Sequence, residues 1–205
     1  MSKKMFLGSS FKDVASLFIS FEKDLAGKTV TFIPTASIGE KVTFYVGAGK
    51  KALNKMGLII DELEISTAAA DDIKNKLTTN DFIYVTGGNT FFLLQELKRT
   101  GADQIIAEQI NSGKTYIGES AGAMVVSANI EYAKLMDPIA AAPHLMNYDA
   151  LGLVDFYPVP HYTNFPFKKI AQKIIDTYSA TLNLMPISNK DAILINGDEI
   201  VTVSN

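Results

Sequence analysis

The residues with the clearest capacity for chemistry lie within residues 114–127, which read Lys-Thr-Tyr-Ile-Gly-Glu-Ser-Ala-Gly-Ala-Met-Val-Val-Ser. The β-branched and aromatic residues 115–117 predict the end of a strand, and residues 121–126 predict the start of a helix. Between them, Gly118-Glu119-Ser120-Ala121-Gly122 fits the G-x-S-x-G pattern of a nucleophile elbow. An ordinary strand–turn–helix junction would look the same, so catalysis by Ser120 also requires a base, an orienting group and oxyanion donors.

The base must be one of only two histidines, His144 and His161. His161 follows an extended run and precedes a predicted helix capped by Thr163 or Asn164. Sites in open α/β sheets lie beyond the carboxyl ends of the strands, so we expect His161 to converge on Ser120. His144 lies in an Ala- and Pro-rich segment where no element positions it, and we expect it on the surface of a loop.

A second glycine turn, Thr86-Gly87-Gly88-Asn89-Thr90, follows an apolar strand predicted for residues 82–85. Because this strand should end at the same edge as Ser120, the Gly88 and Ala121 N–H groups could together stabilise an oxyanion. Gly87 and Asn89 belong to the same candidate oxyanion and substrate-binding turn. Asn89 is also the expected N-cap of the next helix, and the two roles are compatible.

The apolar spacing along the rest of the chain predicts strands that alternate with helices. We expect strands at residues 5–7, 29–33, 58–65, 82–85 and 115–117, and helices at 11–25, 42–56, 68–77, 91–97 and 103–110. A long loop or an excursion at the sheet edge should span residues 129–151, and a hairpin centred on Asn196-Gly197 should follow near the end. This order predicts one α/β domain over residues 1–205, with a mostly parallel sheet, helices on both faces and a terminal β-hairpin.

Composition narrows the classes of partner and cofactor. The 205 residues carry a net charge of −3 and no cysteine, so disulfides, thiolate metal sites and a cysteine nucleophile are excluded. Neither a basic footprint for nucleic acid nor a polybasic membrane patch is present. The N-terminal sequence resembles neither a signal peptide nor a membrane span, so we expect a cytoplasmic protein. We expect no metal or organic cofactor, and the oligomeric state stays open.

Three segments together carry a resemblance to a known family. They are Gly118-Glu119-Ser120-Ala121-Gly122-Ala123, Thr86-Gly87-Gly88-Asn89-Thr90, and Leu151-Gly152-Leu153 leading to Pro160-His161. In this order and spacing they resemble the peptidase E (aspartyl dipeptidase) family of serine peptidases, which includes cyanophycinase-like relatives. The resemblance implies a fold like that of class I glutamine amidotransferases, with serine in place of cysteine. It also implies Ser120 as nucleophile, His161 as base, and Gly88 and Ala121 as oxyanion donors.

The sequence departs from that family at two points. The family commonly has a glutamate as third catalytic member, whereas the matching position here holds Asn189, with Asp191 as a nearby competitor. Relatives that remove N-terminal aspartate are thought to hold its carboxylate with arginine, but the one arginine here, Arg99, lies well after the Gly-Gly turn. Lys168 and Lys169 follow the candidate base and are more typical of a solvated helix face. Strong selection for N-terminal aspartate is therefore not expected.

These observations predict a serine peptidase that hydrolyses short peptides, in particular dipeptides. Two alternatives stay open: a serine esterase or amidase with the same site, and a binding protein that keeps the elbow but has lost turnover. The missing acidic third member favours the second alternative. An α/β-hydrolase fits less well, because that fold is usually larger and no His-Gly-Gly oxyanion motif precedes the elbow.

Overall fold

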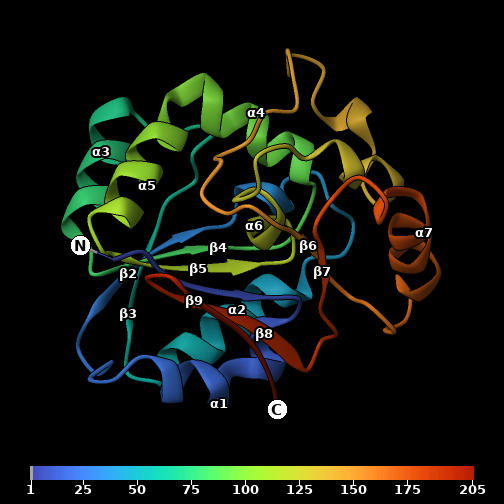
Figure 1. Cartoon of the computed structure of the whole chain (residues 1–205). Coiled ribbons are helices and arrows are strands. Elements are labelled where there is room, and N and C mark those ends of the chain that lie inside the picture. Colours follow the sequence, from blue (N-terminus) through green and yellow to red (C-terminus); the bar gives the residue numbers. More distant parts are fainter. Residues whose placement is uncertain (1) are drawn as a thin grey trace.

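The computed structural model describes residues 2–205, and a seven-stranded sheet in the order β3-β2-β4-β5-β1-β8-β9 forms its centre (Figure 1). The strands are β1 (Lys4–Gly8), β2 (Thr29–Ile33), β3 (Ile59–Glu62), β4 (Phe82–Val85), β5 (Thr115–Glu119), β8 (Asp191–Asn196) and β9 (Glu199–Ser204). The five strands β1 to β5 run parallel to one another, and the β8–β9 hairpin adds two antiparallel strands beside β1. The predicted α/β fold class, with a mostly parallel sheet, is confirmed.

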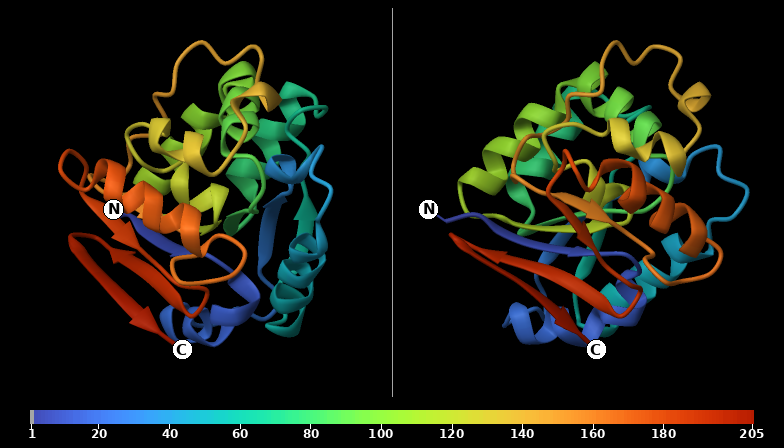
Figure 2. Two further views of the ribbon diagram at one scale, coloured as in Figure 1. Left: turned by 90° about the vertical axis from the view of Figure 1, so that its right-hand side faces the viewer. Right: turned by 45° about the vertical axis from the view of Figure 1, so that its right-hand side comes forward.

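Helices cover both faces of this sheet (Figure 1, Figure 2). α1 (Phe11–Phe21) and α2 (Phe44–Lys55) pack on one face, whereas α3 (Ala70–Thr79), α4 (Thr90–Thr100) and α5 (Ala102–Asn111) pack on the other. The strands supply both cores because successive side chains point to opposite faces. In β1, Phe6 joins the core under α1 and α2, whereas Met5 and Leu7 join the core on the opposite face.

The remaining elements are short, apart from one helix. α6 (Ala121–Met124) has only four residues, fewer than the predicted 121–126, and α7 (Lys168–Tyr178) has eleven. Single 3₁₀ turns occur at Thr35–Ser37, Glu131–Leu135 and Ile139–Ala141. The last two lie in the segment 129–151, which is otherwise irregular, as expected.

A second, two-stranded parallel sheet stands beside the main one. It consists of β6 (Tyr157–Val159) and β7 (Leu184–Pro186), with Tyr157 opposite Leu184 and Val159 opposite Pro186. The carboxyl ends of parallel strands lie at the same edge. The segments that follow β6 and β7 therefore emerge side by side, although about 25 residues separate the strands in the chain.

The structure corrects the predicted start of the helix after His161. α7 begins at Lys168 with Phe167 as its N-cap residue, so neither Thr163 nor Asn164 caps it. The Asn164 side chain has a different partner, because its Oδ1 accepts a hydrogen bond from the Asn189 backbone N–H at 2.8 Å. The polar residues before the helix thus form the loop that carries the candidate site.

Several other bounds differ from the sequence-based prediction. β3 spans Ile59–Glu62 rather than 58–65, and the helices expected at 42–56 and 68–77 span Phe44–Lys55 and Ala70–Thr79. α1 ends at Phe21, four residues before Leu25, which is buried in the following loop. In the hairpin, Asn196 pairs with Glu199, so the two central turn residues are Gly197 and Asp198 rather than Asn196 and Gly197. Gly197 has φ of 64°, the left-handed conformation that a tight hairpin turn requires.

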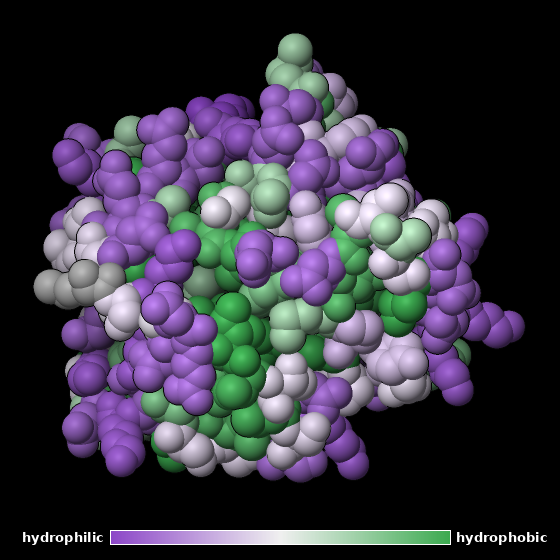
Figure 3. Space-filling view, in the orientation of Figure 1, coloured by the Kyte–Doolittle hydropathy of each residue, from purple (hydrophilic) through white to green (hydrophobic). Residues whose placement is uncertain are grey.

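Figure 3 shows a surface on which hydrophilic residues surround a central apolar area, in the region where β8 and β9 lie in Figure 1. β9 forms one edge of the sheet and exposes Ile200 and Val201. Across residues 2–205, none of the helices combines the length and the hydropathy that crossing a bilayer requires.

Candidate active site

Ser120 stands in a strained turn between β5 and α6. Its backbone has φ of 51° and ψ of −104°, and its N–H donates to the Gly8 carbonyl at 2.8 Å. A Cβ added to Gly118 would lie 2.5 Å from the Gly122 carbonyl oxygen, and one added to Gly122 would lie 2.4 Å from that of Val85. Both glycines of the G-x-S-x-G pattern are thus required by space, and the turn has the geometry of a nucleophile elbow.

His161 lies directly against this serine. Its Nε2 is 3.0 Å from Ser120 Oγ, within hydrogen-bond distance, and both side chains are half-buried. The expected convergence is found, but His161 follows β6 in the second sheet rather than a strand of the main sheet.

The turn after β1 fixes the main chain of His161. The His161 N–H donates to Ser9 Oγ at 3.0 Å, and Ser9 Oγ donates to the Ile187 carbonyl at 2.9 Å. His161 also has φ of 61°, which is uncommon for a residue with a side chain. Since β1 pairs with β5, these contacts join the second sheet to the strand that carries Ser120.

Asn189 follows Ser120 and His161 as the third residue of the candidate site. Its Oδ1 is 2.8 Å from His161 Nδ1. An amide oxygen only accepts hydrogen bonds, so Nδ1 carries the proton and Nε2 is left to accept from the Ser120 hydroxyl. The structure therefore brings Ser120, His161 and Asn189 into one continuous hydrogen-bonded chain.

Asp191 and His144, the alternatives to Asn189 and His161, point elsewhere. Asp191 begins β8, where its carboxylate accepts from the Ser188 N–H at 2.8 Å and from the Ser204 hydroxyl. Burial raises the pKa of Asp191, but the hydrogen bonds from Ser204 and Ser188 outweigh it and leave the pKa below its usual value. His144 is exposed on a loop, as expected.

The surroundings of His161 keep its ring neutral. Burial lowers its pKa below the usual 6.5, and the hydrogen bond that Nδ1–H donates to Asn189 opposes this only in part. Phe167 stacks on the imidazole with ring centroids 4.9 Å apart and planes at 26°. A neutral imidazole at pH 7 is the form that can accept a proton from serine. Phe167 was missed by the sequence analysis, because an aromatic residue before a helix carries no specific signal.

The turn after β4 lies beside Ser120. A Cβ added to Gly87 would lie 3.1 Å from Ser120 Cβ, and one added to Gly88 would lie 2.0 Å from the Ala36 carbonyl oxygen. Gly88 has φ of 136°, which favours glycine. Within residues 2–205, neither the Gly88 nor the Ala121 N–H donates to a protein acceptor. Both amides are therefore available to an oxyanion.

Asn89 acts as the helix cap that its sequence position predicts. Its Oδ1 accepts from the Phe92 N–H at 2.9 Å, and its own N–H donates to the Ala36 carbonyl at 2.7 Å. Asp137, which the sequence analysis missed, accepts from the next residue, Thr90, through the backbone N–H at 2.9 Å. Burial raises the pKa of Asp137 to about 6. These contacts hold the start of α4, immediately after the two glycines.

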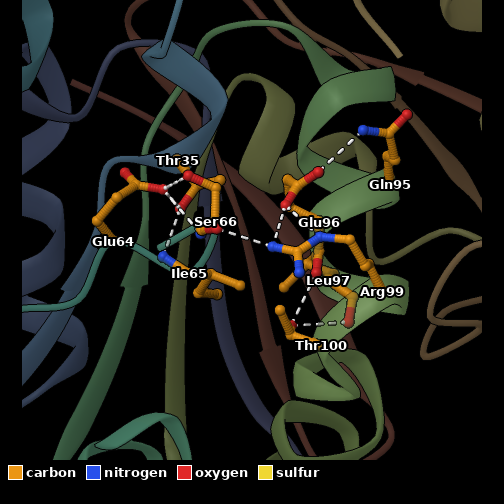
Figure 4. A network of polar contacts seen from close by, with 9 residues as sticks. All are labelled: Thr35, Glu64, Ile65, Ser66, Gln95, Glu96, Leu97, Arg99 and Thr100. Atoms are coloured by element: carbon orange, nitrogen blue, oxygen red, sulfur yellow. Dashed lines mark hydrogen bonds and ion pairs between the residues drawn. The ribbon is translucent and has the colours of Figure 1, made fainter. Parts of the chain in front are cut away.

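Arg99 belongs to a network away from this site (Figure 4). Its guanidinium donates to Glu96 Oε2, at 2.8 Å from Nε and 2.6 Å from Nη2, and to the Ser66 carbonyl at 2.8 Å. Arg99 lies nine residues along α4 from Thr90, or about 14 Å at 1.5 Å per residue. The only arginine therefore contributes to the structure of this helix.

A surface cavity of about 350 Å³ borders the loop after His161. Its lining includes Tyr162 and Thr163 from that loop and the lysines Lys168, Lys169 and Lys173 from α7. The lysines are thus on an open face, in keeping with the expected solvated helix surface.

Across residues 2–205, the structure contains no cluster of three or more His, Cys, Asp or Glu side chains that could hold a metal ion.

Relatives of the chain define its class as a peptidase. An uncharacterised peptidase of Listeria monocytogenes is 61% identical over 200 residues, which cover 98% of both chains. An uncharacterised peptidase of Pasteurella multocida is 56% identical over 99% of this chain and 98% of its own length. Peptidase E of Haemophilus influenzae is 32% identical over 70% of this chain and 62% of its own length.

The sequence profile of peptidase family S51 matches residues 4–203, and the chain belongs to this family. The crystal structure of a candidate peptidase E from Listeria monocytogenes superimposes with a TM-score of 0.97, covers all of both chains and is 60% identical. The crystal structure of a peptidase from an actinobacterium shares the fold, with a TM-score of 0.69 and 23% identity, and covers 100% of this chain and 88% of that one. The resemblance to peptidase E and the expected peptidase class are confirmed.

Proposed function

We propose that the protein is a serine peptidase that hydrolyses short peptides, in particular dipeptides, with Ser120 as nucleophile and His161 as base. The observation that carries this proposal is the chain of two short contacts, 3.0 Å from Ser120 Oγ to His161 Nε2 and 2.8 Å from His161 Nδ1 to Asn189 Oδ1. A serine hydroxyl is a weak nucleophile at neutral pH and requires an adjacent base of this kind.

The proposed reaction proceeds through an acyl-enzyme. Ser120 Oγ attacks the peptide carbonyl carbon while its proton passes to His161 Nε2, and the carbonyl oxygen becomes an oxyanion held by the Gly88 and Ala121 N–H groups. The C–N bond then breaks, and His161 gives its proton to the leaving amine. In the second half, His161 takes a proton from water, which attacks the ester, and returns the proton to Ser120 Oγ as the acid leaves.

Asn189 would act in this reaction as a neutral orienter. Its amide oxygen selects the tautomer in which Nε2 faces Ser120, as asparagine does in papain-like proteases. It adds no negative charge to offset the imidazolium that forms in each half-reaction. We therefore expect slower turnover than a carboxylate at this position would allow.

The pairing of Arg99 supports a substrate range that does not depend on N-terminal aspartate. A buried substrate carboxylate requires a charged, hydrogen-bonded partner. Arg99 is already paired with Glu96 outside the site, and the lysines of α7 lie on an open surface. We therefore propose short peptides with a free N-terminus as substrates, without strong selection for aspartate.

A binding protein without turnover is the second candidate, and the amide of Asn189 is the observation that favours it. An esterase or amidase using the same residues is a variant of the main proposal, distinguished by faster turnover of small esters. The test is hydrolysis of a dipeptide library by the wild type and by Ser120→Ala, with far-ultraviolet circular dichroism as a control for folding. We expect release of amino acids by the wild type only. Inactivity of both proteins on peptides and esters would support the binding protein.

A further inference from the structure

Glu119 is a buried carboxylate immediately before the nucleophile, and the reaction described above does not use it. The residue is 3% exposed. Oε1 accepts from the Phe11 N–H at 2.9 Å, and Oε2 accepts from the Tyr84 hydroxyl at 2.8 Å. The backbone N–H of Gly87 also faces this carboxylate and favours its charged form. A buried charge is expensive unless it is paired or well hydrogen-bonded, so its presence requires an explanation.

The three donors come from three elements around the site. Phe11 is the first residue of α1, Tyr84 lies in β4, and Gly87 belongs to the oxyanion turn after β4. Glu119 itself is the last residue of β5, joined by one peptide bond to Ser120. Its carboxylate is therefore a contact between the strand that carries the nucleophile and the turn that carries the Gly88 donor.

We propose that Glu119 is a positioning residue that holds the Gly87-Gly88 turn at a fixed distance from Ser120, and this rests on the proposed function. The residue touches neither substrate nor reacting atoms. Oxyanion donors act only when they lie about 3 Å from the position that the oxyanion will occupy. A shift of about 1 Å in such a group can reduce the rate by about a hundredfold. Fixing this turn would thus raise kcat without contributing to substrate binding.

The arrangement requires an ionised carboxylate. A carboxylate has only acceptor sites, and here it faces three donors, whereas a protonated acid or a carboxamide places donors of its own among them. The Tyr84 hydroxyl can rotate and become an acceptor, but the two backbone N–H groups, from Phe11 and Gly87, cannot. Protonation of Glu119, or its replacement by glutamine, should therefore loosen a backbone contact.

The charged surroundings give this role a signature in pH. The titratable groups that face Glu119 are Tyr84 from β4, Asp13 from α1 and Tyr45 from α2. Burial raises the pKa of Glu119 to about 7, the hydrogen bonds from Phe11, Tyr84 and Gly87 lower it, and the charge of Asp13 raises it slightly. The pKa of His161 lies below 6.5. As pH falls, a positioning role makes activity decline near 7, whereas His161 alone makes it decline below 6.5.

The test is the steady-state kinetics of Glu119→Gln on a dipeptide that the wild type cleaves, measured from pH 5 to 9. We expect kcat to fall about tenfold to a hundredfold, with KM within about twofold of the wild type. The remaining activity should decline only below pH 6.5, because the step due to Glu119 is removed. The matched control is Glu96→Gln, the same change at a glutamate that is 5% exposed and lies in the Arg99 network of Figure 4. Glu96→Gln should keep the wild-type kcat and pH profile.

Each outcome separates this inference from the proposed function. An active wild type, an inactive Ser120→Ala and a Glu119→Gln with wild-type kcat and pH profile would overturn only the role of Glu119. If the wild type itself is inactive on peptides and esters, the proposed function fails and this role fails with it. Should Glu119→Gln not fold, Tyr84→Phe takes its place, because it removes one donor to the carboxylate and keeps the carboxylate itself. A lower kcat with an unchanged KM in Tyr84→Phe supports the role, and a wild-type kcat contradicts it.

Discussion

The Nδ1 atom of His161 lies 2.8 Å from Oδ1 of Asn189, two residues that belong to loops following different strands of the small second sheet. The Asn189 backbone is held in turn by Asn164, so the amide faces the imidazole from a fixed position. A neutral acceptor occupies the place where a carboxylate usually stands in serine hydrolases. In the proposed reaction, Asn189 would therefore orient His161 without supplying a charge that compensates the imidazolium.

Removal of the Asn189 amide should impair turnover. Asn189→Ala leaves the His161 Nδ1–H without its partner, so we expect kcat to fall several-fold or more while KM changes little. Asp191→Asn is the matched control, because Asp191 bonds to Ser188 and Ser204 instead of the histidine. A loss of about 10⁴-fold in Asp191→Asn, the size seen for a triad aspartate, would identify Asp191 as the true orienter.

A carboxylate at position 189 should raise the pKa of His161. In Asn189→Asp, the negative charge beside the ring stabilises the imidazolium and opposes the effect of burial. The histidine then stays protonated to higher pH, and the acid limb of activity that depends on it moves upward. NMR titration of the two imidazole rings measures this directly, with His144→Ala to assign them. An unchanged His161 pKa would show that position 189 does not contact the ring.

Loss of the base should be far more damaging than loss of the other histidine. We expect His161→Ala to lower kcat by about 10³-fold or more, in line with deletion of triad members. His144 is exposed and contacts the protein through its backbone N–H to Gln95, so His144→Ala should keep normal kinetics. Severe loss in His144→Ala together with an active His161→Ala would refute the assignment.

Selection for N-terminal aspartate should be weak. Comparison of kcat/KM for Asp-Leu, Asn-Leu and Ala-Leu isolates the effect of the charge, because Asp and Asn have nearly the same shape. With Arg99 committed to Glu96, we expect the three values to lie within about a hundredfold of one another. An aspartate preference above about 10²-fold, or roughly 2.7 kcal/mol, would point to a carboxylate site formed by other residues, with the lysines of α7 as candidates.

Patterns that repeat along the chain predicted much of this fold. The bounds of β2 and β4 agree with the sequence-based ones, because each is a run of apolar residues closed by a turn signal. The elbow was visible because steric crowding at Gly118 and Gly122 forces a recognisable spacing. These features depend on local backbone geometry, which a single sequence encodes directly.

Features that depend on distant contacts were missed. β6 lies within the extended run expected before His161, but β7 has only three residues, too few to show periodicity, and the pairing of the two strands brings together residues about 25 positions apart. Asn164 looked like a helix cap because its type suits one, but its side chain bonds to Asn189. Glu119 occupies a variable position of the motif, so only the fold reveals the donors around it.

The most direct test of the account is covalent labelling of Ser120 by a fluorophosphonate, located by mass spectrometry of the digested protein. An activated serine should react in the wild type, and the label should be found on the peptide that contains Ser120. The label should be absent from Ser120→Ala and strongly reduced in His161→Ala, with both variants folded. No labelling of the wild type, or a label on another residue, would contradict the claim that Ser120 and His161 form the catalytic pair.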